Sequence, residues 1–214
     1  MTAAANDAVT PLPERVRVLI EVWFGLPDDP DREKHRDIWF KCPPEHDDML
    51  RRLFLADYEQ AAAGALGAWE TAPHSALALL LLLDQIPRNI FRNTPRAYDT
   101  DPMARAAAAC ALTHGFDAAV PPAWRIFFYL PFHHSEDLAD QRRATELTES
   151  LRDERDPDPE GGANRRYGRP YPEVIARFGR FPHRNAILGR PSTPEELAFL
   201  AECNLLPPKP APST

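Results

Sequence analysis

The sequence predicts an all-α fold, and three observations support this prediction. Apolar residues recur at helical spacing, as Val16, Leu19 and Ile20 do near the start of the chain. Alternation of apolar and polar residues, which is typical of half-buried strands, is weak throughout, and β-branched residues are few. The 24 prolines mostly separate apolar segments, which favours short helices with rigid connections. We therefore expect about eight to ten helices of modest length.

Four helices are expected in the N-terminal half of the chain, at residues 13–24, 31–40, 44–70 and 73–85. Gly25 and Pro27 end the first of them. The run from Ala76 to Leu83 is apolar on nearly every side, which predicts that the fourth helix lies at the centre of the fold. Pro87 follows and is expected to end or kink this helix.

Five further helices are expected in the C-terminal half, at residues 101–115, 122–130, 135–154, 171–180 and from 193 onwards. Asp101 with Pro102 is a strong start signal, because Asp caps free N–H groups and Pro fits the first turn. A turn at Pro131 should place the two histidines that follow it at the start of a new helix, which Ser135 caps. Thr193 to Glu196 form a capping box that opens the last helix.

The length of 214 residues suggests one domain, which we expect over residues 12–204. Residues 1–11 are interpreted as a flexible leader and residues 205–214 as a disordered tail. Residues 156–170 are rich in Gly, Pro and charge and are expected to form an exposed loop. The three cysteines lie far apart, which argues against a disulfide framework and for free thiols in a reducing cytoplasm.

Charge and hydropathy argue against two broad classes of protein. The net charge of -7 and the pI near 5.5 are unlike those of a general nucleic-acid binder, which presents a broad basic face. The N-terminus has no apolar signal core, and the apolar run from Ala76 to Leu83 is far shorter than the roughly 20 residues of a membrane span. We expect a cytoplasmic protein that binds neither nucleic acid nor membrane.

Three segments place polar groups among apolar residues in a way that suggests a binding site. In the first, residues 79–92, the central helix carries an acid, arginines and amides to the point where it breaks. These candidate ligand-binding residues are Asp84, Gln85, Arg88, Asn89 and Arg92. A buried carboxylate must be paired or face a cavity. The alternative is therefore an internal Asp84–Arg88 pair, one helical turn apart, that ties off the helix end.

The second segment, residues 124–141, leads from aromatic residues into two histidines and several acids. Imidazole titrates near neutral pH and acts with carboxylates in acid–base chemistry. The candidates here are His134, Glu136 and Asp137 as catalytic residues and Gln141 as a ligand-binding residue. The alternative is helix capping, because acids near a helix N-terminus are stabilised by its dipole. Two pairs spaced one turn apart leave a metal site open, namely His133 with Asp137 and Glu136 with Asp140. Their spacing matches no strong motif, so we assign no metal ligand.

The third segment, residues 177–190, gathers four arginines and a histidine with no acid among them. If its first part is helical, Arg177, Arg180 and Arg184 share one face, which Pro182 bends. Arginine suits a planar, bidentate grip on carboxylate or phosphate. The catalytic candidate of this segment is His183, and its ligand-binding candidates are Arg177, Arg180, Arg184, Asn185 and Arg190. The alternative is surface arginines stacked on aromatic rings and neutralised by acids elsewhere.

The chain resembles the bacterial domain-of-unknown-function family 924. The resemblance extends over nearly the whole chain and is carried by LDQIPRNIFR (83–92), GFD (115–117), YLPFHHSEDLADQ (129–141) and RFGRFPHRNAILGRPSTPEELAFL (177–200). It implies a right-handed array of antiparallel, tetratricopeptide-like helices, and it implies no activity. Two departures stand out: His133 occupies a position that is more often apolar in the family, and the loop at residues 156–170 is longer and more polar.

The first functional hypothesis is a pocket for an anionic small molecule, formed where the three segments meet on a concave face. An arginine clamp would hold the carboxylate or phosphate and would consist of Arg88, Arg92, Arg180 and Arg184. His134 or His183 would transfer a proton, oriented by an acid of the second segment. Aromatic residues would exclude water, with Trp23, Trp39, Trp124 and Phe128 as candidates. No P-loop, nucleophile elbow or dinucleotide fingerprint is present, so enzymatic activity and a flavin, haem or other cofactor stay open.

Two other hypotheses remain. Tetratricopeptide-like arrays commonly bind extended peptides, and an arginine clamp suits a peptide's C-terminal carboxylate. The same cations and acids are also suited to an internal ion-pair network that fixes helix packing.

Overall fold

The computed structural model describes residues 12–39, 42–151 and 171–203. All regular secondary structure in these ranges is helical, which confirms the predicted fold class. The α-helices are α1 (Glu14–Phe24), α2 (Pro44–Ala62), α3 (Pro73–Leu80), α4 (Ile86–Ile90), α5 (Asp101–Thr113), α6 (Pro122–His133), α7 (Leu138–Ser150), α10 (Tyr171–Phe178) and α11 (Pro194–Glu202). The short 3₁₀ turns are η1 (Asp37–Trp39), η2 (Gly67–Thr71), η4 (Pro95–Tyr98), η5 (Asp117–Ala119) and η6 (Pro182–Arg184).

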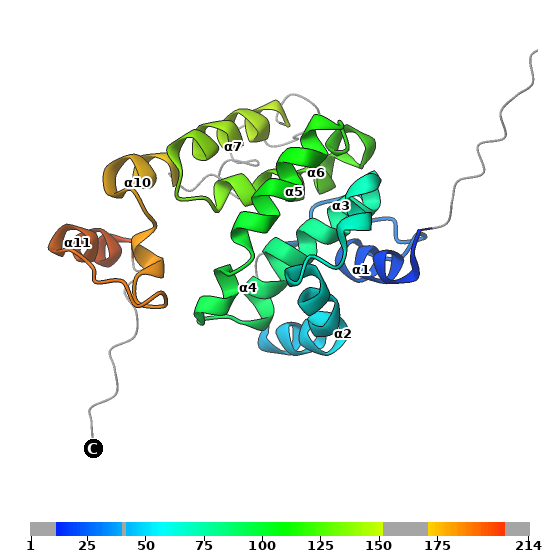
Figure 1. Ribbon diagram of the computed structural model, residues 1–214, viewed down its shortest axis with the longest axis horizontal. Helices are drawn as coiled ribbons and strands as arrows, with labels where there is room; N and C mark the ends of the chain where they lie inside the picture. Colours follow the sequence, from blue (N-terminus) through cyan, green and yellow to red (C-terminus); the bar gives the residue numbers. More distant parts are fainter. Residues whose placement is uncertain (1–11, 40–41, 152–170, 204–214) are drawn as a thin grey trace, which may run out of the picture.

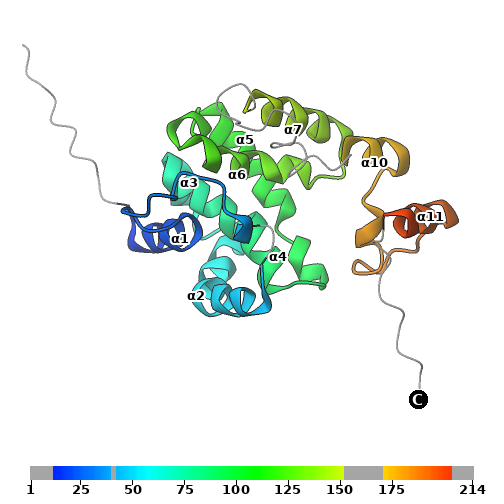
Figure 2. The ribbon, with the colours of Figure 1, turned by 180° about the vertical axis from the view of Figure 1, so that it is seen from behind.

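The described helices form a larger body, residues 12–151, and a smaller C-terminal module, residues 171–203. Figures 1 and 2 show α10 and α11 at one end of the elongated molecule, with α1 and α3 at the other. Within the body, α2 packs on α4, α3 on α1 and α5, and α6 on both α5 and α7. The module reaches the body chiefly through contacts of α10 with α7.

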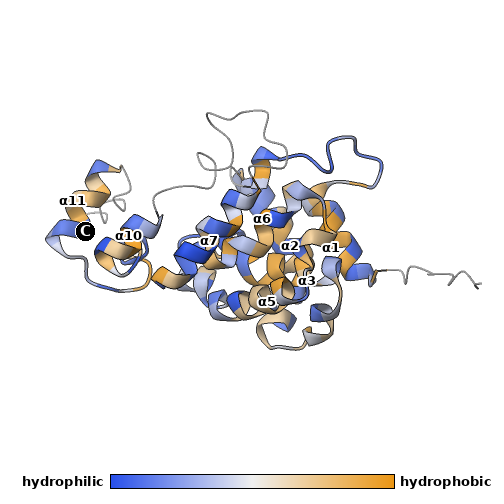
Figure 3. Cartoon of the chain, turned by 90° about the horizontal axis from the view of Figure 1, so that it is seen from above, coloured by the Kyte–Doolittle hydropathy of each residue, from blue (hydrophilic) through white to orange (hydrophobic). Residues whose placement is uncertain are grey.

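The predicted central helix lies at the centre of the body. Every residue from Ala76 to Leu83 is buried, as expected for a helix that is apolar on all sides. Residues coloured as hydrophobic in Figure 3 are frequent in α2, α3 and α5, and buried residues of these helices and of α1 belong to the core of the body. Burial of this surface is the main force that holds the helices of the body together.

Of the two outcomes expected at Pro87, an end or a kink of the central helix, the end does not occur. A π-helical turn, η3 (Leu81–Gln85), joins α3 to α4, and the Ile86 N–H group donates to the Leu81 carbonyl. Pro87 lies in the first turn of α4 and lacks an N–H group, and the Leu83 carbonyl one turn earlier accepts from the Thr100 hydroxyl. The wider π turn accommodates the proline and carries Asp84 and Gln85, and such π turns are frequent at functional sites.

Two predictions at the junction of α6 and α7 were wrong. Helix α6 runs through Pro131, so His133 ends this helix and His134 is its C-cap, whereas both were expected to open the next one. Asp137, not Ser135, caps α7, because its carboxylate accepts from the backbone N–H groups of Ala139 and Asp140. An interior proline only weakens a helix, and the packing of the aromatic residues in α6 outweighs that cost.

Two other expected helix boundaries and one expected helix cap also differ. Residues 31–36 form turns and only η1 follows, because the Asp29 carboxylate accepts from the Asp31 N–H group and so favours a turn. Helix α2 ends at Ala62, before Gly64, whose φ of +73° is left-handed. Asp101 begins α5 as expected but does not cap it, since its carboxylate binds arginines instead.

The C-terminal module has a small core of its own, built from Val174, Ile175 and Phe181. Gly179, with φ of +66°, ends α10, so the chain leaves the helix before Arg180. The capping box of α11 is confirmed: Thr193 Oγ1 accepts from the Glu196 N–H group, and the Glu196 carboxylate accepts from the Thr193 N–H group.

Cys42, Cys110 and Cys203 are free thiols. In the ranges that the structure describes, no helix has the length and apolar character needed to cross a membrane. The leader at 1–11, the loop at 156–170 and the tail at 205–214 lie outside the described residues.

Removal of the α11 cap should destabilise the protein. Thr193→Ala deletes the Oγ1 acceptor of the capping box, and loss of such a cap typically costs about 1 kcal/mol of unfolding free energy. Chemical denaturation measures the change. Thr113→Ala is the matched control, since Thr113 Oγ1 bonds only a carbonyl one turn earlier in α5. Equal stability of the two variants would contradict the prediction.

Candidate functional site

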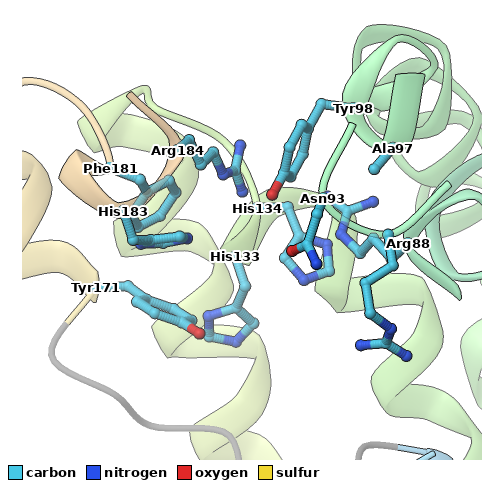
Figure 4. A pocket seen from close by; sticks show the side chains of 11 residues that line it. Arg88, Asn93, Ala97, Tyr98, His133, His134, Tyr171, Phe181, His183 and Arg184 are labelled. Carbon is cyan, nitrogen blue, oxygen red and sulfur yellow. The ribbon is translucent and has the colours of Figure 1, made fainter. Parts of the chain in front are cut away.

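A polar pocket of about 270 Å³ lies between the body and the C-terminal module. In Figure 4, Arg184, Phe181, His183 and Tyr171 form the module's wall, Tyr98, Ala97 and Asn93 face them, and the two consecutive histidines lie between. The full lining comprises Arg88, Arg92, Asn93, Ala97, Tyr98, His133, His134, Tyr171, Phe181, His183 and Arg184. Among the described residues, this lining contains arginines, histidines and tyrosines but no carboxylate.

Asp84 is not part of the lining, but its carboxylate contacts two lining residues, Arg88 and His134. Its side chain is 1% exposed, and its Oδ1 lies 2.8 Å from His134 Nδ1 and 3.2 Å from Arg88 Nη1. Arg88 also donates to the Asp84 backbone carbonyl, and the Gln85 amide donates to Asp84 Oδ2. The expected Asp84–Arg88 pair therefore forms, but as part of a larger cluster that also contains a histidine from α6.

Asp101 is the second buried carboxylate of the cluster. Arg88 Nη2 donates to both of its oxygens, at 2.9 and 3.0 Å. Arg184 Nη1 reaches Asp101 Oδ2 at 3.5 Å, which is an ion pair but too long and weak for a good hydrogen bond. Asp101 thus links the body to the module through two arginines from different parts of the chain.

Arg184 is a buried cation with few polar partners. Its side chain is 8% exposed and lies between the rings of Tyr98 and Phe181, at 4.7 and 4.6 Å from their centroids. Its Nε is buried without a hydrogen-bond partner, and no guanidinium hydrogen bond joins it to any residue that the structure describes. Burial and repulsion from Arg88 lower its pKa, although arginine stays protonated in proteins.

The protonation states of the cluster follow from these contacts. Burial alone would raise the pKa of Asp84, but the charge of Arg88, together with hydrogen bonds from His134 and Gln85, holds it well below its ordinary value. Burial, followed by the charge of Arg88, lowers the pKa of His134, although Asp84 opposes that shift. An ionised Asp84 beside a neutral His134 is therefore the resting state near neutral pH.

His133 is neutral for a simpler reason. Its side chain is buried, Nε2 lies 2.8 Å from Thr148 Oγ1, and Nδ1 has no hydrogen-bond partner among the described residues. Burial, with a further contribution from His134, lowers the pKa of His133 to about 4.

Asn93 adds a backbone feature to the pocket wall. Its φ of +62° makes it the one left-handed non-glycine residue in the described ranges. Asparagine adopts this conformation at modest cost, and such positions gather at functional sites. The conformation directs the amide toward the two histidines in Figure 4.

Several predicted ligand-binding residues form structural contacts instead of pocket contacts. Arg92 lines the rim of the pocket but is bidentate to Asp47 of α2, which also accepts from the Asn89 amide. Gln141 is buried, and its amide donates to the carbonyls of His133 and Ser135, so it caps the end of α6. These contacts fix the backbone beneath the pocket. The Asn89 and Gln141 side chains are not part of the lining, whereas Arg92 is.

Glu136 and Asp137 do not orient His134, in contrast to the sequence-based expectation. Glu136 accepts from both Arg190 terminal nitrogens, at 2.7 and 2.9 Å, and from the Phe181 N–H group at 2.7 Å. Burial would raise the pKa of Glu136, but these hydrogen bonds lower it. Asp137 caps α7, as described above. Both acids therefore position backbone, and Glu136 fastens the module to the body.

The remaining arginines of the third segment are paired within the module. Arg177 binds Glu195, and Arg180 is bidentate to Glu196 at 2.6 and 2.9 Å. Asn185 is fully buried and bonds Glu196 and Arg190. Because α10 ends before Arg180, the three arginines expected on one face point to different partners, and only Arg184 enters the pocket.

The aromatic residues that were expected to exclude water from the pocket do not line it. Trp23, Trp39 and Trp124 pack around Phe24 and Phe127 in the core of the body, and Phe128 is fully buried there. No group of three potential metal ligands occurs in the described part of the chain.

Among the polar residues outside the three segments, sequence reasoning missed the lining residues Asn93, Tyr98 and Tyr171 and the supporting residue Asp101. Asp101 was assigned to helix capping, for which its position was sufficient explanation. The other three lie outside the polar–aromatic segments and carry no signal at the level of sequence.

Comparison with known proteins identifies relatives without an assigned activity. A family model described as "Bacterial protein of unknown function (DUF924)" matches residues 19–204. A solved protein of unknown function from Agrobacterium tumefaciens is 39% identical, with a TM-score of 0.75 over 87% of this chain and 97% of its own. No curated protein matches the chain.

The buried His133 should make the protein less stable in mild acid. Unfolded His133 binds a proton below about pH 6.5, whereas the folded protein does not until about pH 4. Its contribution to stability is therefore lost as pH falls through this window. Between pH 7 and pH 5 the free energy of unfolding of the wild type should fall by about 2 kcal/mol more than that of His133→Gln. Denaturation at both pH values measures this, and identical pH dependence would contradict it.

Proposed function

Since this chain belongs to the DUF924 family of bacterial proteins, for which no activity is assigned, we propose a function from the pocket itself. The protein binds a small anionic molecule, a carboxylate or a phosphate, between its body and its C-terminal module. Arg184 is the principal anion-binding residue, and Arg88 and Tyr98 lie beside it.

The observation that carries this proposal is the unsatisfied guanidinium of Arg184. A buried polar group without a hydrogen-bond partner costs free energy, and a charged one costs more. Arg184 has five N–H donors, a stack of two rings and a 3.5 Å ion pair to Asp101, but no hydrogen bond to a described residue. A bound carboxylate or phosphate would supply the bidentate acceptor that this geometry lacks.

The distribution of charge supports an anion over a cation. Asp84 and Asp101 neutralise Arg88 and Arg184 from behind, so burial of these arginines is tolerated without a ligand. The lining that faces the cavity nevertheless contains three arginines and, among the described residues, no carboxylate. An anion would meet these guanidinium charges, whereas a cation would be repelled by them and would find no carboxylate to pair with.

The size of the pocket favours a small molecule over a peptide. A volume of about 270 Å³ is close to the lower end of ordinary ligand pockets, which start at roughly 300 Å³. A peptide groove spreads its contacts along an extended surface. The alternative is a peptide whose C-terminal carboxylate alone enters the pocket, with no enzymatic activity.

Direct binding tests the proposal. Native mass spectrometry of the purified protein shows any retained anion as added mass, and calorimetry measures binding of inorganic phosphate, succinate and citrate. Arg184→Gln should weaken binding of the preferred anion by about ten- to a hundred-fold, because charge-assisted hydrogen bonds are worth about 1.5–3 kcal/mol. Arg177→Gln is the matched control, since Arg177 belongs to the same segment but binds Glu195 at the surface.

Two results would count against a small-molecule site. If no anion binds the wild type and Arg184→Gln only lowers thermal stability, then the cluster is an internal ion-pair network. If peptides with a free C-terminal carboxylate bind and small anions do not, the peptide alternative holds.

A further inference from the structure

The pocket contains a buried Asp–His pair beside the proposed anion-binding arginine. His134 Nδ1 lies 2.8 Å from Asp84 Oδ1, and the imidazole itself lines the cavity. We propose that His134, oriented by Asp84, is a general base that removes a proton from the bound anion. This inference rests on the proposed function and assigns a reaction class to the same site.

Asp84 determines which nitrogen of His134 carries the proton. An ionised carboxylate only accepts hydrogen bonds, so a neutral His134 donates through Nδ1–H. The lone pair then lies on Nε2, which has no hydrogen-bond partner among the described residues. Arg88 and Gln85 hold Asp84 in place, so neither the carboxylate nor the ring is free to reorient. The same logic gives the histidine of a hydrolytic triad its reactive tautomer.

The charges around His134 keep the base in its active, neutral form. The groups that face it from the surrounding elements are Asp84 of η3, Arg88 of α4, Tyr98 of η4, Asp101 of α5, His133 of α6, and His183 and Arg184 of η6. The arginines disfavour a second positive charge, whereas the two aspartates favour it. A bound anion adds negative charge on the cavity side, so it should make proton uptake by His134 easier.

The proton transfer is balanced within the site. The proton passes from an acidic C–H bond of the anion to His134 Nε2, and the electron pair of that bond stays on the substrate as an enolate. Asp84 stabilises the imidazolium that forms, and the Arg184 guanidinium stabilises the oxygen that gains negative charge. His134 then returns the proton to the same carbon or to a neighbouring one.

The rest of the lining restricts the alternatives. No Ser, Thr, Cys or Lys occurs among the described lining residues, so none of these side chains is placed to attack a substrate covalently. The substrate class that fits is a small carboxylate with an acidic carbon next to a carbonyl group. The corresponding reactions are isomerisation, racemisation or enolisation.

The first experiment measures the protonation of His134 in the wild-type protein, so it does not depend on a variant that folds. Long-range ¹H–¹⁵N NMR of ¹⁵N-histidine protein should show His134 at pH 7 as the neutral Nδ1–H tautomer. Saturation with inorganic phosphate should raise the pKa of His134. Exposed His114, which follows the end of α5 and is not part of the lining, serves as the internal control and should not respond. An Nε2–H tautomer, or a ring already protonated at pH 7, would overturn the proposal.

The second experiment measures proton transfer itself. Small 2-oxo and 3-oxo carboxylates are incubated with the protein in D₂O, and mass spectrometry detects carbon-bound deuterium. His134→Gln should lower the exchange rate by at least about 100-fold while calorimetry shows unchanged affinity for the same carboxylate. Asp84→Asn should lower exchange and also remove the tautomer preference in the NMR spectrum, which a purely structural role for Asp84 would not do.

The outcomes separate the two proposals. Carboxylate binding without catalysed exchange would overturn the general base and leave the anion site intact. Absence of both phosphate and carboxylate binding would overturn the anion site and, with it, this inference.

Discussion

Two buried carboxylates make the pocket possible. Asp84 and Asp101 both form ion pairs with Arg88. In addition, Asp84 contacts His134 and Asp101 pairs with Arg184. An unpaired arginine at this depth would cost several kcal/mol, so without the two acids the cations could not be buried. Neither acid is part of the lining, whereas both arginines are. The charge balance of the cluster and the polarity of the pocket thus have one cause.

The pocket exists only where the C-terminal module meets the body. Phe181, Tyr171 and Arg184 come from the module, whereas Tyr98 and His134 come from the body. Glu136 holds the two parts together through Arg190 and the Phe181 N–H group. Much of the cationic segment at residues 177–190 therefore serves this assembly. The ion-pair network expected from the sequence accounts for three of its arginines, and the fourth, Arg184, carries the proposed function.

The fold was predictable because its signals are local. Helical spacing, the apolar run of the central helix and the Thr193 capping box depend on residues within a few turns of each other, and all three predictions were confirmed. Errors arose where distant packing outweighed a local preference. A π turn accommodates Pro87, and aromatic packing carries α6 through Pro131. Pro87 was expected to end or kink its helix and Pro131 to form a turn. A local pattern does not show the contacts with other elements that keep these segments helical.

The sequence by itself determined the fold class, the positions of most helices and the three segments from which the site is drawn. Only the tertiary structure decided which charged and polar side chains of the site contact one another. His134 pairs with Asp84, 50 residues away, and not with the neighbouring Glu136 or Asp137. Asp101 binds Arg88 and Arg184 and does not cap its helix. The physical reason is that a charged side chain is satisfied by whichever opposite charge packing brings within about 3 Å, and that neighbour is set by helix contacts that a local pattern does not encode.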